Sequence, residues 1–139
     1  MKFKKLAQWA TLPTRAHEDD LGIDLYALDT TLVSASGNTL VRTGVAASFD
    51  PGIGGILKDR SSVASKQRLY VKAGVIDPSY RGEILVLLEN PSGKGQLIQG
   101  GSKIAQMVLV PSVATSIEEI EEFEDETARG TGGFGSTGA

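Results

Sequence analysis

Short apolar runs, each bounded by glycine, proline or polar turn residues, recur along the chain of 139 residues. β-Branched and apolar residues between such turn signals are typical of strands, and helical periodicity is hard to find. The pattern therefore predicts an all-β domain of short strands. The expected strands are residues 2–10, 23–27, 39–49, 54–57, 84–88, 96–99 and 104–110, with a further edge strand in 112–123.

The segment 74–90, GVIDPSYRGEILVLLEN, carries the strongest local signal. Pro78 fixes φ and lacks an N–H, so Asp77-Pro78 indicates a turn. The five apolar residues 84–88 that follow predict a strand buried on both faces. We therefore expect a β-hairpin with Asp77 and Tyr80 at its bend. Asp77 is then either a turn-forming residue or a reactive group on a loop between rigid strands.

Residues 61–67 are the one stretch expected to be helical, with Ser61 or Ser62 capping its N-terminus. Arg60 precedes them and adds a guanidinium fork, which binds phosphate oxygens bidentately. Free N–H groups at a helix start also favour an anion. The segment is therefore either a plain helix cap or a phosphate cradle.

The last residues, 125–139, are rich in glycine and threonine and almost without apolar residues. Such a segment cannot order itself by burial. It nevertheless contains Arg129, Phe134, Ser136 and Thr137, which are groups that can bind a nucleotide. We interpret the segment as an arm that orders on a ligand, with a low-complexity tail as the alternative.

Composition excludes several classes of site. The chain has no cysteine and one histidine, His17, so disulfides, thiolate metal sites and Ser–His triads are not expected. The net charge is −3, and no basic stripe with aromatic residues points to nucleic acid. No apolar run approaches the ~20 residues of a membrane span. We expect a soluble cytoplasmic protein, or one in the host cytoplasm if the source is viral.

Five blocks in this order resemble the trimeric deoxyuridine triphosphatases (dUTPases), and together they cover nearly the whole chain. The blocks are DLGIDLYA at 20–27, DRSSVA at 59–64, GVIDPSYRGE at 74–83, GSKIAQMVL at 101–109 and RGTGGFGSTG at 129–138. The resemblance implies a distorted jelly-roll (β-clip) subunit at 1–124 and a homotrimer whose active sites are shared. It also implies that the arm, 125–139, closes over the active site of a neighbouring subunit.

The resemblance further implies Mg²⁺-dependent hydrolysis of dUTP to dUMP and pyrophosphate, which keeps uracil out of DNA and supplies dUMP. Asp77 matches the aspartate that activates the water attacking the α-phosphorus. Tyr80 matches the tyrosine that packs under the deoxyribose and excludes a 2′-hydroxyl. Asp24 matches the acid that holds Mg²⁺ through water. The substrate contacts implied elsewhere are Gly74, Val75 and Ile76 for uracil, Arg60, Ser61, Ser62 and Gln106 for phosphates, and Arg129, Phe134, Gly135, Ser136 and Thr137 in the arm.

The chain departs from the family pattern at a few positions. Leu21 stands where alanine is usual, and Pro78-Ser79 lacks an acid often found there. Ser102-Lys103 replaces the usual Asp-Arg, which keeps a cation and loses an acid. Thr131 stands at a variable position. None of these residues matches one with a chemical step.

Two other functions stay open. The first is deamination of dCTP on the same fold, which needs a glutamate where this chain has Leu87; Glu89 lies two residues further on. The second is a phage-type regulatory role, in which the acidic segment 118–126 contacts a protein partner. Acidic runs are more often only solvated.

Overall fold

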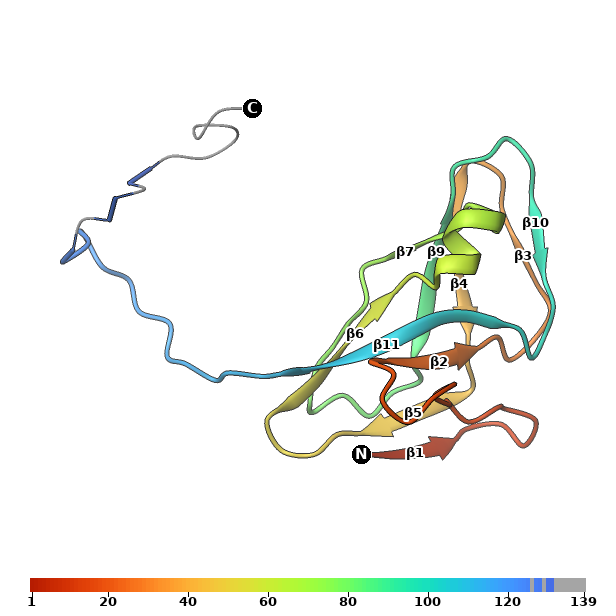
Figure 1. The fold of residues 1–139 in the computed structure, drawn as a ribbon, viewed down its shortest axis with the longest axis horizontal. Coiled ribbons are helices and arrows are strands. Elements are labelled where there is room, and N and C mark those ends of the chain that lie inside the picture. The colour runs from red at the N-terminus through yellow and green to blue at the C-terminus, as the bar shows by residue number, and fades with distance from the viewer. Residues whose placement is uncertain (126, 129, 132–139) are drawn as a thin grey trace.

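The computed structural model describes residues 1–125, 127, 128, 130 and 131 and has the expected all-β, jelly-roll-like architecture (Figure 1). One short helix, η1 (Val63–Gln67), interrupts the strands. The strands are β1 (Lys2–Lys5), β2 (Gly22–Tyr26), β3 (Thr31–Val33), β4 (Gly37–Arg42), β5 (Val45–Ser48), β6 (Ile53–Lys58), β7 (Tyr70–Lys72), β8 (Val75–Ile76), β9 (Leu85–Asn90), β10 (Gln96–Ile98) and β11 (Lys103–Pro111).

The largest sheet has the strand order β2-β11-β6-β8, and a second sheet has the order β4-β9-β7. Two pairs, β1-β5 and β10-β3, complete the described strands, and all the pairings are antiparallel. Apolar side chains from these strands form one main core, which includes Leu25, Leu57, Val86, Leu88 and Met107. The core therefore holds β2, β11 and β6 rigidly beside one another.

The register around β11 brings three distant segments together. Gln106 lies opposite Asp24 of β2 on one side and opposite Lys58 of β6 on the other. Directly opposed residues in an antiparallel ladder share a face of the sheet. Asp24 and Gln106 therefore lie side by side, next to the end of β6.

The prediction of a β-hairpin in 74–90 is wrong, although the predicted turn at Asp77-Pro78 is present. β8 pairs with β6, whereas β9 pairs with β4 and β7. The β6 partner contains Gly54, where a Cβ atom would lie 3.1 Å from the Ile76 carbonyl oxygen. The missing side chain lets the backbones approach, and this long-range pairing prevails over the local one.

The strand in 84–88 is buried on one face, not on both. Val86 and Leu88 are fully buried, whereas Leu85 is exposed. The strand expected in 39–49 divides into β4 and β5 around Gly44, whose φ of +68° favours glycine.

η1 lies within the expected helix, but the Ser62 side chain makes no cap hydrogen bond. The predicted hydroxyl cap is therefore wrong for Ser62.

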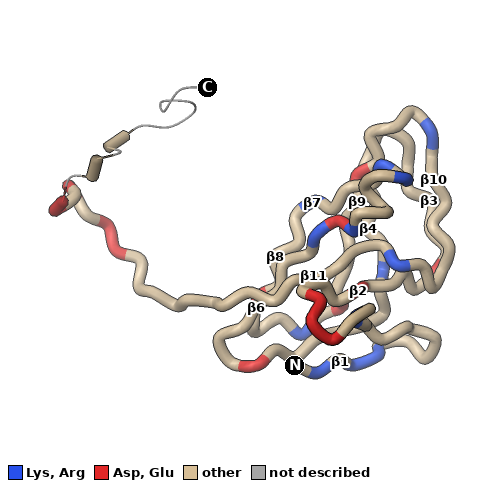
Figure 2. Tube along the Cα trace, in the orientation of Figure 1, with Lys and Arg blue, Asp and Glu red and all other residues tan. Residues whose placement is uncertain are grey.

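Residues 112–125 follow β11 as an extended segment that leads away from the body (Figure 1). They form no strand, so the edge strand predicted there is wrong. Their acidic residues mark the segment in Figure 2. Ile117 and Phe123 are 99% and 85% exposed. Among the described residues, no helix is long and apolar enough to cross a membrane.

Candidate active site

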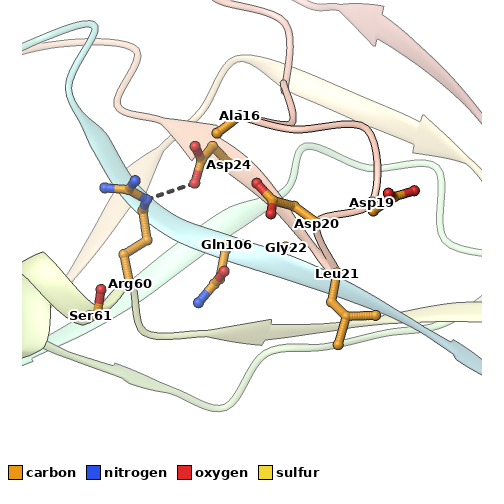
Figure 3. Close-up of a pocket in the computed structure, with 9 residues that line it drawn as sticks. All are labelled: Ala16, Asp19, Asp20, Leu21, Gly22, Asp24, Arg60, Ser61 and Gln106. Atoms are coloured by element: carbon orange, nitrogen blue, oxygen red, sulfur yellow. Dashed lines mark hydrogen bonds and ion pairs between the residues drawn. The ribbon is translucent and has the colours of Figure 1, made fainter.

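A pocket of about 430 Å³ opens where β2, β11 and the end of β6 meet (Figure 3). Its floor comes from strand residues and its rim from the loop that precedes β2. The residues that line it are Ala16, Asp19, Asp20, Leu21, Gly22, Asp24, Arg60, Ser61 and Gln106. The structure thus brings together four residues predicted from the sequence, which are Asp24, Arg60, Ser61 and Gln106.

Asp24 is the buried charge of this pocket, with only 6% of its surface exposed. Its Oδ1 lies 2.6 Å from Arg60 Nε, and its Oδ2 lies 2.7 Å from Lys103 Nζ. The hydrogen bond to Asp24 raises the pKa of the Lys103 ammonium above its ordinary value of 10.5. A buried carboxylate needs such partners, so Asp24 is not simply a solvated residue on the polar face of a strand.

Arg60 enters the pocket from the residues that follow β6. Its Nη1 donates a hydrogen bond to Ser62 Oγ at 3.2 Å, while Ser61 is exposed at the pocket wall. One guanidinium is thus held at two points beside two hydroxyl groups. Such a group can donate charge-assisted hydrogen bonds to a phosphate.

Gln106 fixes the backbone that carries Arg60. Its Nε2 donates to the Asp59 carbonyl oxygen at 2.7 Å. The Asp59 carboxylate in turn accepts a hydrogen bond from the Val71 N–H. A Cβ atom on Gly22 would lie 2.0 Å from Gln106 Oε1, so this position needs glycine to leave room for the side chain.

The segment that carries Asp77 forms a tight turn. Tyr80 N donates to the Asp77 carbonyl oxygen at 3.0 Å, and Tyr80 Oη donates to the Glu83 carbonyl oxygen at 3.0 Å. Arg81 Nη1 donates to the Pro78 carbonyl oxygen at 2.8 Å. The Asp77 side chain lies on the exposed surface of this turn.

Gly74, just before β8, connects this turn to β6. Leu57 N donates to the Gly74 carbonyl oxygen at 2.8 Å. Gly74 has a φ of +104° and the preceding Ala73 a φ of +57°. A non-glycine residue in the left-handed region is uncommon and occurs more often at functional sites. The backbone of 73–76 is therefore held in one specific conformation, with Val75 exposed and Ile76 half-buried.

Within one chain, Asp77 lies far from the pocket. It follows β8, whose Ile76 pairs with Gly55 near the start of β6. Arg60 lies beyond the other end of that strand. At a rise of ~3.3 Å per residue, the stretch from Gly54 to Arg60 spans roughly 20 Å. A single chain therefore presents two separate groups of predicted site residues, one in the pocket and one at the turn.

The predictions for the arm fall on residues outside the described part of the chain. They concern Arg129, Phe134, Gly135, Ser136 and Thr137.

Sequence reasoning missed three charged residues that the fold brings to the pocket. Asp19 and Asp20 line it, and Lys103 binds Asp24. The acidic pair at the start of the first block, Asp19 and Asp20, was an available signal, whereas the direction of Lys103 depends on a strand irregularity that the sequence pattern does not reveal.

The donor set fits a magnesium ion only in part. Within the described residues, no group of three or more histidine, cysteine, aspartate or glutamate side chains could hold a metal alone. Mg²⁺ usually keeps several waters and binds one or two carboxylates together with substrate phosphates. Asp24 suits that arrangement through a water, because both of its oxygens already bind cations.

Comparisons with known proteins agree on one family. Residues 8–138 match the family model described as dUTPase. The chain is 39% identical to a deoxyuridine 5'-triphosphate nucleotidohydrolase of Gloeothece citriformis, over 99% of this chain and 96% of that protein. It is 41% identical to one from Paramecium bursaria Chlorella virus 1, over 97% and 95% of the two chains.

A solved structure of the Staphylococcus bacteriophage 80alpha dUTPase with dUPNHPP has a TM-score of 0.92 and 29% identity, and the match covers 99% of this chain and 98% of that one. Sequence and fold therefore lead to the same conclusion: the chain belongs to the dUTPase family, the enzymes that hydrolyse deoxyuridine triphosphate.

Proposed function

We propose that this chain hydrolyses dUTP to dUMP and pyrophosphate in active sites built from several subunits. The pocket of one subunit binds the triphosphate, and the turn of another subunit supplies Asp77. The observation that carries this proposal is the separation of Asp77 from Arg60 within one chain. A homotrimer brings the two groups together, because a cyclic assembly repeats the same contact at each interface.

Asp77 acts as the general base. Its carboxylate accepts a proton from a water molecule while the water oxygen forms a bond to the α-phosphorus, and the bond from that phosphorus to the bridging oxygen breaks, so that pyrophosphate leaves with the bridging oxygen. An exposed aspartate on a fixed turn suits this role, since a general base must lie within hydrogen-bond reach of the water.

Selection of deoxyuridine rests on the same turn. The backbone of Gly74, Val75 and Ile76 reads the uracil edge, and its fixed conformation leaves no room for a thymine methyl group. Tyr80 packs under the deoxyribose. Its hydroxyl is tied to the Glu83 carbonyl oxygen, which supports the ring in a position that excludes a 2′-hydroxyl.

Arg60, Ser61 and Ser62 bind phosphate oxygens, and Gln106 holds the backbone that carries them. One N–H of the Gln106 amide is bonded to the Asp59 carbonyl oxygen, and the second N–H of the same amide would make the phosphate contact that the resemblance implies. Asp24 would hold Mg²⁺ through a water molecule. When bound, the ion offsets the charge of the triphosphate.

The body of the subunit spans 1–124, and the arm, 125–139, closes over the site of a neighbouring subunit. Arg129 and Ser136 then meet the γ-phosphate and Phe134 stacks on uracil, with Gly135 and Thr137 beside them. The extended course of 112–125 away from its own body supports this arrangement. Closure of such a lid excludes water other than the attacking molecule.

The test is pyrophosphate release from each deoxynucleoside triphosphate and from UTP, with Mg²⁺ present. The proposal expects rapid release from dUTP alone. The same assay with dCTP, followed by detection of ammonia, tests the deaminase alternative. We expect no ammonia, because Leu87 replaces the required glutamate and Glu89 is ion-paired to Lys72 at 2.7 Å.

A regulatory role stays a prediction. Phage dUTPases, represented by the Staphylococcus bacteriophage 80alpha protein, are described as controlling the transfer of virulence genes. In this chain the exposed acidic segment 118–125 is the surface that such a role would use. Capture of a partner by an Asp77→Asn protein without activity would support it.

A further inference from the structure

Lys103 reaches Asp24, a residue that lines the pocket, because β11 contains a bulge. Lys103 pairs with Tyr26 and Ala105 pairs with Leu25, with a register shift between Lys103 and Ala105. In an unbroken ladder Ile104 would oppose Tyr26, and Lys103 would point to the core side of the sheet. The bulge leaves Ile104 and Ala105 both buried and turns Lys103 to the face of Asp24.

Tyr26 fixes the direction of the Lys103 side chain. The Lys103 ammonium lies 5.9 Å from the centroid of the Tyr26 ring, a distance at which a cation is attracted to the ring face. The Tyr26 hydroxyl shares a hydrogen bond of 2.6 Å with Thr14 Oγ1. The cation is thus held against Asp24 by a ring that is itself anchored.

Arg60 and Lys103 each bind a different oxygen of the Asp24 carboxylate. Arg60 Nε binds Oδ1 and Lys103 Nζ binds Oδ2. Figure 3 shows the single contact between Arg60 and Asp24. Asp24 and Ser62 each take one of the five N–H donors of the guanidinium, and the described residues bind none of the other three, which can therefore bind a ligand.

Without Lys103, the second oxygen of Asp24 would be free for the same guanidinium. Arginine and carboxylate pair readily through two parallel hydrogen bonds, and the pairing gains energy from both. Such a bidentate pair would turn a terminal nitrogen of Arg60 toward Asp24 and away from the pocket.

We infer that Lys103 is a positioning residue: by occupying Asp24 Oδ2, it keeps Arg60 on one oxygen and leaves the terminal nitrogens of Arg60 for the triphosphate. This inference rests on the proposed function, in which Arg60 binds phosphate. It assigns no direct contact between Lys103 and the nucleotide.

The test measures binding of the analogue dUpNHpp by calorimetry in EDTA, so that neither catalysis nor a metal enters the result. Lys103→Met removes the charge and keeps much of the side chain. We expect binding weaker by about tenfold or more, the size expected when a charged hydrogen bond to phosphate is lost. Lys103→Arg, which can still donate to Oδ2, should bind within about threefold of the unmodified protein. Lys94→Met removes a charge in the turn between β9 and β10 and should leave binding unchanged.

A second background separates positioning from direct contact. In an Asp24→Asn protein, the carboxylate that would bind Arg60 through both oxygens is gone. Adding Lys103→Met to this protein should therefore weaken dUpNHpp binding by less than about twofold. A crystal structure of the Lys103→Met protein should show Arg60 with two hydrogen bonds to Asp24.

Three results would overturn the inference. One is unchanged binding by Lys103→Met, and another is a tenfold loss that persists in the Asp24→Asn background, which would make Lys103 a direct ligand. The third is an Arg60 that keeps a single contact to Asp24 in the Lys103→Met crystal structure. Failure of the unmodified protein to bind dUpNHpp both in EDTA and with Mg²⁺ present would instead refute the proposed function and this inference together.

Discussion

Asp77 and Arg60 lie at opposite ends of β6. Asp77 follows β8, which pairs with Gly55 and Ile56, while Arg60 stands two residues beyond the last residue of the strand, Lys58. In the proposed function, the water-activating carboxylate and the phosphate-binding guanidinium must both reach one triphosphate. The proposal therefore divides the site between chains, and each part of the site can be tested separately.

Replacing the proposed base should slow chemistry and spare binding. Asp77→Asn should lower kcat by about 10²–10⁴-fold, the usual loss when a general base is removed. Since Asp77 is exposed, the melting temperature should stay within a degree or two of the original, as surface substitutions usually change stability by only ~0.5 kcal/mol. Steady-state kinetics and dUpNHpp binding check this, and a variant with normal kcat would show that another group activates the water.

Removal of the Tyr80 ring should admit ribonucleotides. Tyr80→Ala opens the space under the sugar, so kcat/KM for UTP relative to dUTP should rise by at least about tenfold, in the range expected for loss of a well-packed contact. Tyr80→Phe loses only the hydrogen bond to the Glu83 carbonyl oxygen and should keep the preference for dUTP. An unchanged preference in Tyr80→Ala would contradict the role of the ring.

Gly74 and Gly52 both have a positive φ, so Gly52 provides a matched control for a substitution at Gly74. A Cβ atom on Gly74 would lie 2.8 Å from the Leu57 Cβ, whereas one on Gly52 would meet nothing within 4 Å. Gly52→Ala therefore reports backbone strain alone, about 1 kcal/mol, and Gly74→Ala should cost about 1–3 kcal/mol more.

Urea unfolding measures both costs. We also expect Gly74→Ala, but not Gly52→Ala, to weaken dUTP binding, because residue 74 belongs to the proposed uracil contact. If the two substitutions had equal effects on urea unfolding and on dUTP binding, Gly74 would not belong to the uracil contact.

Deletion of residues 129–139 should leave the body intact. The buried core residues all lie within 10–107, so the shortened protein should unfold at the same urea concentration as the complete one. Its turnover should fall by about 10²-fold or more, because the proposed lid and its phosphate contacts are gone. Full activity without these residues would refute the lid.

Local sequence signals predicted local structure well. Asp77-Pro78 indicated a turn, and the hydrogen bond from Tyr80 N to the Asp77 carbonyl oxygen confirms it. Arg60-Ser61-Ser62 indicated a group of donors; Arg60 and Ser61 line the pocket, and Ser62 is hydrogen-bonded to Arg60. Turn and helix signals depend on neighbouring residues, so they can be read without knowing the fold.

Such local signals do not predict which strands pair when they are distant in sequence. β8 pairs with β6 and not with the strand that follows it in sequence. This pairing depends on Gly54, which has no side chain to separate the two backbones. Asp24 is buried because Arg60, distant in sequence, neutralises it, and Lys103 joins them through a bulge in β11. Alternation of apolar and polar residues does not reveal a bulge, because one extra residue changes which face the side chains occupy.

Complementation between inactive chains tests the shared site most directly. Asp77→Asn and Arg60→Met chains are each expected to be inactive alone. After they are unfolded together in equal amounts and refolded, about a quarter of the sites in random trimers should pair an intact Asp77 with an intact Arg60 from another chain. The control is a mixture of Asp77→Asn chains with chains carrying both substitutions, in which no intact pair can form.

The measurement is dUTP-dependent pyrophosphate release by the refolded mixtures. We predict that the mixture of the two single variants recovers about a quarter of the original activity while the control mixture stays inactive. No recovery in the first mixture, with normal recovery of unmodified protein treated in the same way, would contradict an active site shared between subunits.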